Sequence, residues 1–338
     1  MLRELIEKIM RYENLNITEA YDAMDYIMDG NSNESQIASF LTALGMKEPS
    51  IDEISGFSRA MLAKAQKLTS RHENIVDTCG TGGDRKNTFN ISTTAAFIAA
   101  GAGVIVAKHG NRSVSSKSGS ADVLEELGVN LDIELESVAS CIDDIGIGFI
   151  FAPKAHTAMK NVSKVRKDMG IKTVFNILGP ITNPAMANGR VLGVFDQKLI
   201  DVMVYSLKNL GVKRAFVVYG LETLDEISVS GKSLVAELSD GKVNKYMLNP
   251  EELGFKNYCI DELKGGEPAE NAKILKQILT GEEKGAKRDS SILNASAAII
   301  AGGLAYDLKE AISMASDSID SGNALKKLNQ LIDHTNKF

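Results

Sequence analysis

The sequence contains no tryptophan, few other aromatic residues and only three cysteines. Aromatic residues make up 6% of the 338 residues, so the core has to be built mainly from aliphatic side chains. Cys79, Cys141 and Cys259 lie far apart and form no CxxC pair, which suggests neither a disulfide framework nor a zinc site. The N-terminal segment is charged and amphipathic, unlike a signal peptide, and the alanine-rich run 93–107 is too short to span a membrane. We therefore expect a cytoplasmic protein.

The chain also lacks an excess of basic residues. It has 38 Lys and Arg against 44 Asp and Glu, which gives a formal net charge of −6. This balance argues against a nucleic-acid-binding surface, although it leaves a local basic patch open. Hydrophobic residues at 44% and charged residues at 24% are typical of a globular protein, and the length allows one large or two ordinary domains. We expect neither a nucleic acid nor a membrane as a partner.

The first part of the chain has a purely helical pattern. No strand-like run interrupts residues 1 to about 68, which predicts a small helical domain. Thr18 is the expected N-cap of a helix over 19–28, and the capping-box pattern at 50–53 predicts a helix that continues to about Lys67. The apolar faces of these helices are expected to form a helix–helix core or a dimer interface.

From Asn74 onwards, short apolar runs alternate with helical patterns. The apolar runs are 75–76, 103–107, 146–151 and 214–219, and the helical patterns are 93–101, 120–127, 134–144 and 197–210. Such alternation predicts a mostly parallel central sheet with helices on both faces. We thus expect an α/β fold with a large domain over residues 72–338. Within it, 226–247 is expected to hold strands joined by hairpin turns at 230–233 and Asp240-Gly241, and the tail 288–335 is expected to be helical with Ser290 or Ser291 as its cap.

Two polar segments are the most informative feature, because each directly follows one of these apolar runs. The first, 77–84, reads DTCGTGGD. Its Gly80, Gly82 and Gly83 allow consecutive backbone N–H groups to converge on an anion, although many glycine-rich turns are only turns. Asp84 would repel a bare phosphate. We expect it to orient a loop amide, or to reach a sugar hydroxyl or a hydrated metal ion.

Hydroxyl and amide side chains follow this glycine loop. Asn90, Ser92 and Thr93 open an alanine-rich helix, whose first N–H groups and dipole favour a phosphate. Simple helix capping is the alternative for Thr93. The hydroxyl cluster next to a glycine loop favours phosphate binding.

The second polar segment, 108–116, reads KHGNRSVSS. Lys108 can neutralise a phosphate, and Asn111, Ser115 and Ser116 can donate hydrogen bonds to one. Arg112 either contacts phosphate or braces the loop, and His109 is either structural or a ligand contact. Gly119-Ser120 then opens another helix. With this many donors, the two segments together predict a diphosphate site.

Asp225 and Glu226 form the main acidic pair and closely follow the apolar run that ends at Tyr219. Adjacent carboxylates are usually no more than a solvated turn. Next to a diphosphate they are the ligands expected for Mg²⁺, which prefers oxygen and bridges phosphates. The run Gly231-Lys232-Ser233 is not a Walker loop, because Glu226 stands where that loop needs its first glycine.

Taken together, these motifs resemble the anthranilate phosphoribosyltransferase family. The matching segments are GTGGD (80–84), NIST (90–93), KHGNRSVSS (108–116), GSAD (119–122), VRKDMGIKTVFNILGPITNP (165–184) and LDEIS (224–228). They occur in the order of the family, and the resemblance spans residues 2 to about 335. The thymidine and pyrimidine-nucleoside phosphorylases are similar in fold and glycine loop, but they lack the KHGNR run and the VFNILGP-like segment.

The resemblance implies a fold, a reaction and an assembly. The fold would be a helical domain over 1–68, with a returning segment at about 160–182, joined by a hinge to the α/β domain. The reaction would be the Mg²⁺-dependent transfer of a phosphoribosyl group from phosphoribosyl pyrophosphate to the amine of anthranilate, which releases pyrophosphate in tryptophan biosynthesis. Two Mg²⁺ ions per subunit and a homodimer packed through the helical domains are also implied.

The resemblance further implies which residues hold each substrate. Phosphoribosyl pyrophosphate would be bound by Gly80, Gly82, Gly83, Asp84, Thr88, Asn90, Ser92, Thr93, Lys108, Asn111, Arg112, Ser115, Ser116 and Ser120. Anthranilate would be bound by Gly80, His109, Asn111, His156, Arg166 and Pro180. Mg²⁺ would be bound by Ser92, Asp225 and Glu226, and the catalytic residues would be Lys108, Arg166, Asp225 and Glu226.

Two other functions are compatible with the same motifs. A nucleoside phosphorylase of this fold would act on a base, and Arg166 favours an acidic substrate because a guanidinium pairs with a carboxylate in a bidentate manner. A non-catalytic relative that binds a ligand or nucleic acid would be expected to lose Asp225-Glu226 or Arg166 and to gain a basic face. This chain keeps both features and has a net charge of −6.

Overall fold

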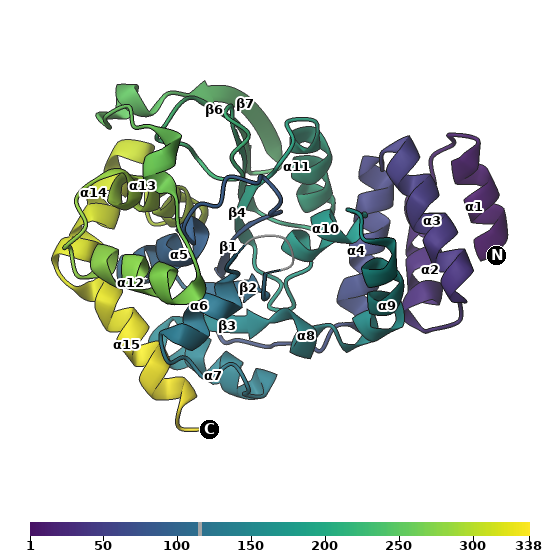
Figure 1. The fold of residues 1–338 in the computed structure, drawn as a ribbon, viewed down its shortest axis with the longest axis horizontal. Helices are drawn as coiled ribbons and strands as arrows, with labels where there is room; N and C mark the ends of the chain where they lie inside the picture. Colours follow the sequence, from purple (N-terminus) through teal and green to yellow (C-terminus); the bar gives the residue numbers. More distant parts are fainter. Residues whose placement is uncertain (114–116) are drawn as a thin grey trace.

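The structure of the protein is a computed structural model that describes residues 1–113 and 117–338. N-terminal helices lie at one end of the molecule, and a seven-stranded sheet with helices on both faces forms the rest (Figure 1). This arrangement confirms the predicted fold class, an α/β protein with a small helical part and a mostly parallel sheet. Among the described residues, no helix is long and apolar enough to cross a membrane.

The N-terminal part consists of four helices, and a helix from later in the chain packs beside them (Figure 1). Their bounds are α1 Leu2–Met10, α2 Ile17–Met28, α3 Glu34–Lys47, α4 Ile51–Lys64 and α9 Lys160–Met169. Helix α9 contacts α2 and α3, so this segment returns to the N-terminal helices as the resemblance implies. The predicted domain boundary between residues 68 and 72 stays a prediction.

Capping residues decide where these helices begin. The predicted capping box at the start of α4 is confirmed, since Ser50 and Glu53 bond to each other's backbone N–H groups; the helix ends at Lys64, three residues before the predicted end. The predicted cap Thr18 is wrong. Asn16 caps α2 in a capping box with Glu19, because an Asx side chain three residues before a glutamate can exchange two hydrogen bonds with it.

Replacing Asn16 by Ala is expected to lower the free energy of unfolding by about 1 kcal/mol, because the N–H of Glu19 loses its acceptor. The measurement is urea unfolding followed by circular dichroism. Thr18→Ala is the matched control, since Thr18 is also exposed and lies two residues away. Equal stability losses in the two variants would contradict the assignment of Asn16 as the cap.

The sheet has the strand order β3-β2-β1-β4-β5-β6-β7. Strands β1 to β5 are parallel, and β6 and β7 add to the edge in antiparallel orientation. The bounds are β1 Val76–Gly80, β2 Val106–Gly110, β3 Ile147–Phe151, β4 Gly189–Gly193, β5 Arg214–Gly220, β6 Ser233–Ser239 and β7 Lys242–Leu248. The carboxyl ends of β1, β2 and β4 therefore meet at one edge of the sheet, and both polar segments begin there.

The sequence pattern did not reveal the central strand β4, because its five residues begin and end with glycine. Gly193 is needed for packing and marks no turn. A Cβ at this position would lie 1.5 Å from the carbonyl oxygen of Asp225, so only glycine lets the chain around Asp225 approach the strand. The close approach brings the acidic pair to the carboxyl end of β4.

The predicted strand pattern over 226–247 is partly wrong. Residues 226–230 form no strand, and a long connection over 221–232 joins β5 to its antiparallel neighbour β6. The predicted turn at Asp240-Gly241 is confirmed between β6 and β7. Both of its residues have positive φ, as a two-residue hairpin turn requires.

Helices cover both faces of the sheet, and neighbouring strand residues point to opposite faces. Val191 and Phe216 belong to the core on the side of α5 (Ile91–Gly101) and α13 (Ala286–Ala301). Leu192 and Val217 belong to a second core, which also contains side chains of the N-terminal helices. This second core joins the N-terminal helices to the sheet.

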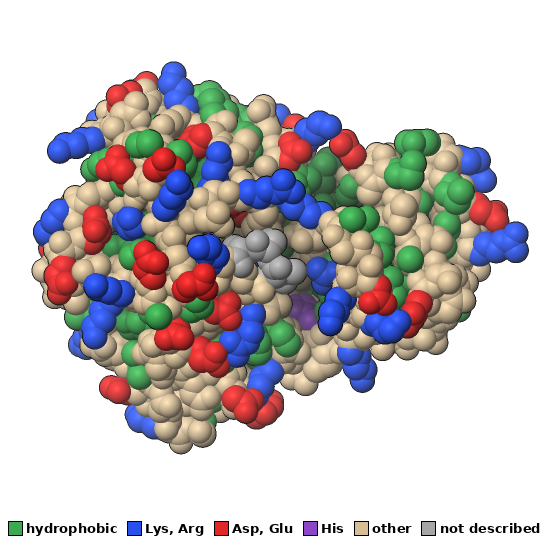
Figure 2. Space-filling model, in the orientation of Figure 1, with side chains coloured by type: hydrophobic (Ala, Val, Ile, Leu, Met, Phe, Trp, Pro, Cys, Tyr) green, Lys and Arg blue, Asp and Glu red, His purple; other side chains and the backbone are tan. Residues whose placement is uncertain are grey.

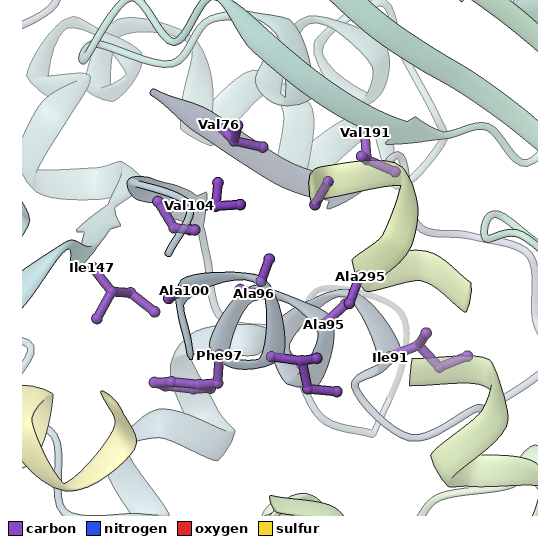
Figure 3. Close-up of a cluster of buried hydrophobic side chains, with 14 of the residues drawn as sticks. Val76, Ile91, Ala95, Ala96, Phe97, Ala100, Val104, Ile147, Val191 and Ala295 are labelled. Carbon is purple, nitrogen blue, oxygen red and sulfur yellow. The ribbon is translucent and has the colours of Figure 1, made fainter. Parts of the chain in front are cut away.

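Small side chains bring α5 close to the sheet. Figure 3 shows Ala95, Ala96 and Ala100 of this helix near the strands that carry Val76 and Val191, with Ala295 of α13 beside them. Because α5 follows β1 and runs back along the sheet, its first turn lies at the carboxyl end of β1. The alanine-rich pattern therefore positions a helix N-terminus at the edge where the polar segments begin.

The predicted helices 93–101, 120–127, 134–144 and 197–210 are confirmed with small shifts at their ends. They are α5, α6 Ser120–Glu126, α7 Leu135–Ile145 and α11 Leu199–Asn209. The predicted cap at Ser290 or Ser291 is wrong, since α13 begins at Ala286 and both serines are buried inside it.

The remaining helices are α8 Ala152–Ala155, α10 Phe175–Leu178, α12 Pro268–Leu279, α14 Leu308–Asp320 and α15 Asn323–Thr335. Short 3₁₀ turns are η1 Thr157–Met159, η2 Gly179–Ile181, η3 Pro250–Leu253 and η4 Ile260–Leu263.

Candidate functional site

A cavity of about 810 Å³ lies at the carboxyl ends of β1 and β2, where α9 faces the α/β part. In parallel α/β sheets this edge is the usual place for a ligand. Figure 2 shows Lys and Arg side chains around the hollow between the two parts of the molecule. The polar segments were predicted as loops, but their first residues are the ends of strands: Asp77 to Gly80 belong to β1, and Lys108 to Gly110 belong to β2.

The cavity brings together most of the predicted site residues. Its walls include Gly80, Gly82, Gly83, Asp84, Thr88, Asn90, Ser92, Thr93, Lys108, His109, Asn111, Arg112, Ser120, Arg166, Asp225 and Glu226. His156 and Pro180 do not line it. The predictions for Ser115 and Ser116 fall outside the described residues. The cavity also has walls that the sequence reasoning missed, among them Lys172, Asn176 and Asn271.

The glycine loop is held by the acidic pair. The N–H of Gly82 donates to Asp225 Oδ2 over 2.7 Å, and a Cβ at Gly80 would lie 2.3 Å from the same oxygen. Gly82 and Gly83 have φ of 66° and 81°, a region that disfavours side chains. Asp225 thus orients a loop amide. Asp84 also does so, which was one of its predicted roles, because its Oδ1 accepts from the backbone N–H of Lys86 over 3.1 Å.

Glu226 contacts the first turn of α5. The backbone N–H of Ser92 donates to Glu226 Oε1 over 3.1 Å, so a carboxylate occupies the positive end of this helix. Asn90 does not cap α5 with its own side chain. Its amide instead donates to the carbonyl of Ser118 and accepts from Asn271, which ties the helix start to the wall of the cavity.

The two carboxylates are hard to ionise in this environment. Burial, followed by the charge of Asp84, raises the pKa of Asp225 to about 7. Burial, followed by the charge of Asp225, raises the pKa of Glu226 to about 8. One oxygen of Asp84, Oδ2, is also buried and has no hydrogen-bond partner among residues 1–113 and 117–338. A bound cation would relieve all three carboxylates, because it compensates their charge and offers the orphan oxygen a partner.

Lys108 is a buried cation close to these carboxylates. Its side chain is 4% exposed, and its ammonium donates to the carbonyl of Thr78 and, over 3.4 Å, to the hydroxyl of Ser92. Burial lowers its pKa, while Asp77 and Glu226 counteract the effect. The ammonium therefore lies between the end of β1 and the start of α5, beside the predicted metal ligands.

Arg112 braces its loop, which was one of its two predicted roles. Its guanidinium forms two hydrogen bonds with Glu125, of 2.7 and 2.9 Å, and one with Asp122 of 3.1 Å. Asp122 also accepts from the backbone N–H groups of Ser113 and Gly119. The loop after β2 is thereby anchored to the first turns of α6.

Arg166 of α9 faces the cavity from the opposite side, where Lys167 and Lys172 also line it. Its guanidinium lies 5.1 Å from the ring centre of Phe175, and burial lowers its pKa. Within residues 1–113 and 117–338 it forms no ion pair with a carboxylate. A half-buried guanidinium without such a partner suits the carboxylate of a ligand.

The two histidines predicted for the acceptor pocket differ in position. His109 and His156 have ring centres 5.2 Å apart, and burial lowers the pKa of both. His109 lines the cavity, whereas His156 lies behind it and bonds through Nε2 to the carbonyl of Thr182. Pro180 is also outside the wall, and its carbonyl accepts a hydrogen bond from Cys79.

A buried network that the sequence reasoning missed supports the site from below. Arg190 and Asp77 form an ion pair of 2.7 Å with side chains 4% and 0% exposed. Asn183 donates to Asp77 and to the carbonyl of Ala107, and Asp77 accepts from the backbone N–H of His109. The network connects β1, β2 and β4 where their polar ends begin. Its sequence signals are an Asp and an Arg inside otherwise apolar strands.

Comparisons with known proteins agree with the fold and the motifs. Residues 72–325 match a family described as glycosyl transferase family, a/b domain, and residues 3–65 match its helical bundle domain. Anthranilate phosphoribosyltransferase from Acetivibrio thermocellus is 48% identical over 100% of this chain and 98% of its own length. The enzyme of the same name from Pelotomaculum thermopropionicum is 50% identical over 99% of this chain and 97% of its length.

Solved structures show the same relationship. Anthranilate phosphoribosyltransferase from Thermus thermophilus superposes with a TM-score of 0.93 at 41% identity, covering 98% of this chain and 99% of its own. The Saccharomyces cerevisiae enzyme, solved in complex with phosphoribosyl pyrophosphate and Mg, has a TM-score of 0.90 at 30% identity. The match covers 100% of this chain and 98% of the yeast chain. The chain therefore belongs to the anthranilate phosphoribosyltransferases, enzymes of the glycosyl transferase family.

Proposed function

We propose that the protein transfers the 5-phosphoribosyl group of phosphoribosyl pyrophosphate to the amine of anthranilate and releases pyrophosphate, with Mg²⁺ as its cofactor. The observation that carries the proposal is the position of Arg166. It faces the cavity that also holds the glycine loop and the acidic pair, and it has no carboxylate partner among the described residues. The yeast relative was solved in complex with phosphoribosyl pyrophosphate and Mg and, in a separate structure, with 4-fluoroanthranilate, which supports the choice of both substrates.

The donor set of the cavity fits Mg²⁺. Asp225, Glu226 and the hydroxyl of Ser92 would hold it, and the orphan oxygen of Asp84 adds a further hard ligand, directly or through water. The described residues contain no cluster of three or more His, Cys, Asp or Glu that could bind a metal ion by itself. Diphosphate oxygens would therefore complete the coordination, as they usually do for Mg²⁺. We propose two ions per subunit, which would supply charge compensation for the diphosphate.

The chain's own residues would act by positioning and by stabilising charge. The bond between C1 of the ribose and the diphosphate oxygen breaks, a bond from the amine nitrogen to C1 forms, and the amine proton leaves to solvent. An aromatic amine is neutral at pH 7, so no strong base is required. Lys108 and the N–H groups of the glycine loop would stabilise the departing diphosphate, and Arg166 would hold the acceptor's carboxylate.

A homodimer packed through the N-terminal helices is also proposed. Apolar side chains are exposed on this part of the molecule, including Met10, Tyr12 and Met46. Such residues are common at interfaces between subunits. The dimer would have a mass in solution twice that of one chain, and light scattering measures this mass.

The direct test mixes purified protein with Mg²⁺, phosphoribosyl pyrophosphate and anthranilate and follows the loss of anthranilate fluorescence. A loss that requires all components supports the proposal. If fluorescence persists while the donor and Mg²⁺ raise the melting temperature, the diphosphate site is present and the acceptor is a different molecule. Phosphorolysis of pyrimidine nucleosides, measured in parallel, would favour the nucleoside phosphorylase alternative.

A further inference from the structure

Lys172 contacts the glycine loop, and it comes from the side of the cavity opposite to Lys108. Helix α9, which packs on α2 and α3, ends at Met169, and the next residue, Gly170, is in the left-handed conformation. Two residues later the ammonium of Lys172 reaches the α/β part and donates to the carbonyl of Gly83 over 3.0 Å. Lys108 of β2 instead donates to the carbonyl of Thr78, in the strand that leads into this loop, so the two lysines reach the cavity from different parts of the molecule.

The ammonium of Lys172 has more N–H donors than acceptors among the described residues. An ammonium carries three N–H groups, and within the described residues only the carbonyl of Gly83 accepts from it. The ammonium nitrogen also lies 3.6 Å from the ring centre of Phe195. This cation–π contact stabilises the charge and leaves the N–H donors available. Burial and the charge of Arg85 lower the pKa of Lys172, and the carboxylates of Asp225, Asp84 and Asp196 act in the opposite direction. The ammonium forms no ion pair with any described carboxylate.

The backbone of Gly83, beside Lys172, can also donate a hydrogen bond to an anion. Gly83 has φ of 81°, and no described group accepts a hydrogen bond from its N–H. A Cβ on Gly83 would lie 2.5 Å from the ammonium of Lys172, so the residue must be glycine for the lysine to reach its position. A free loop amide and a partly free ammonium therefore share one small region of the cavity wall.

We propose that Lys172 is a further substrate-binding residue, which contacts the diphosphate of the donor from the side of the helical part. This inference rests on the proposed function. A lysine is suited to phosphate oxygens as a point charge with several donors, whereas bidentate pairing with a carboxylate requires a guanidinium such as Arg166. Because Lys172 and the glycine loop belong to different parts of the molecule, a diphosphate bound by both also links those parts.

The test measures the binding of inorganic pyrophosphate with Mg²⁺ by calorimetry, in the wild-type protein and in Lys172→Met and Lys172→Arg. Lys172→Met is expected to weaken pyrophosphate about 10-fold, the loss typical of one charged hydrogen bond. It should raise KM for phosphoribosyl pyrophosphate by a similar factor and leave KM for anthranilate unchanged at saturating donor. Lys172→Arg keeps the charge and should recover most of the affinity. Lys160→Met is the control, because Lys160 lies on α9, the helix that precedes Lys172, and is exposed and outside the cavity.

Three outcomes would overturn the inference. In the first, Lys172→Met binds pyrophosphate as tightly as the wild type, and in the second it raises both KM values equally. In the third outcome, Lys172→Arg loses affinity as Lys172→Met does and both melt at a lower temperature, which would make Lys172 a structural tether of Gly83. Pyrophosphate binding does not require an acceptor. A protein that binds pyrophosphate through Lys172 but transfers nothing to anthranilate would refute the proposed function and leave the inference intact.

Discussion

Changing Asp225 to Asn and Glu226 to Gln together is expected to lower turnover by about 10³-fold or more, because the variant loses the carboxylates proposed to hold Mg²⁺ at the diphosphate. The amides are close in shape to the carboxylates. Their oxygens can still accept from the N–H groups of Gly82 and Ser92, so the glycine loop and the start of α5 should keep their positions. The expected loss is therefore one of charge, and the fold should be retained.

The measurement is the initial rate as a function of Mg²⁺ and of phosphoribosyl pyrophosphate. The variant should need far more Mg²⁺ for half-maximal rate and should bind the donor weakly at any practical Mg²⁺ concentration. Glu251→Gln with Glu252→Gln is the matched control, since these adjacent carboxylates are exposed and do not line the cavity. An unchanged Mg²⁺ dependence in the first variant would place the metal ligands elsewhere.

The fold could be predicted where local rules and tertiary structure agree. The capping box at Ser50 and the turn at Asp240-Gly241 depend on neighbouring residues only, and both are confirmed. The strand β4 could not be predicted, because Gly193 is explained by the approach of Asp225, 32 residues later in the chain. Likewise, Ser290 matches the pattern of a helix cap, but α13 begins earlier and buries it.

The site could be predicted in outline for a topological reason. Parallel strands place their carboxyl ends at one edge, so polar residues that follow separate apolar runs meet even when, as with Gly82 and Asp225, 143 positions separate them. Which side chains lie behind the cavity wall, and which ones pair with each other, could not be predicted. The sequence does not reveal that His156 lies behind the wall or that Arg112 pairs with Glu125. Lys172 was missed because its role depends on where α9 packs, and no local pattern contains that information.

Arg166→Ala is expected to lower kcat/KM for anthranilate by about 10²-fold, since it removes a bidentate charged interaction with the acceptor. The main effect should be a higher KM for anthranilate, with little change in KM for phosphoribosyl pyrophosphate, because Arg166 lies on α9 and the proposed donor ligands other than Lys172 lie on the α/β part. The melting temperature should change little, because Arg166 has a single aromatic contact and no described ion pair to lose.

Aniline distinguishes the loss of this pairing from a general disturbance of the cavity. It carries the reacting amine but no carboxylate, so the wild-type protein should use it poorly and Arg166→Ala should use it as well as the wild type does. Arg166→Lys should fall between the wild type and Arg166→Ala with anthranilate, because an ammonium keeps the charge and loses the bidentate geometry. If Arg166→Ala impaired aniline and anthranilate by the same factor, Arg166 would act on the cavity as a whole, and the acceptor's carboxylate would have to be bound by another group.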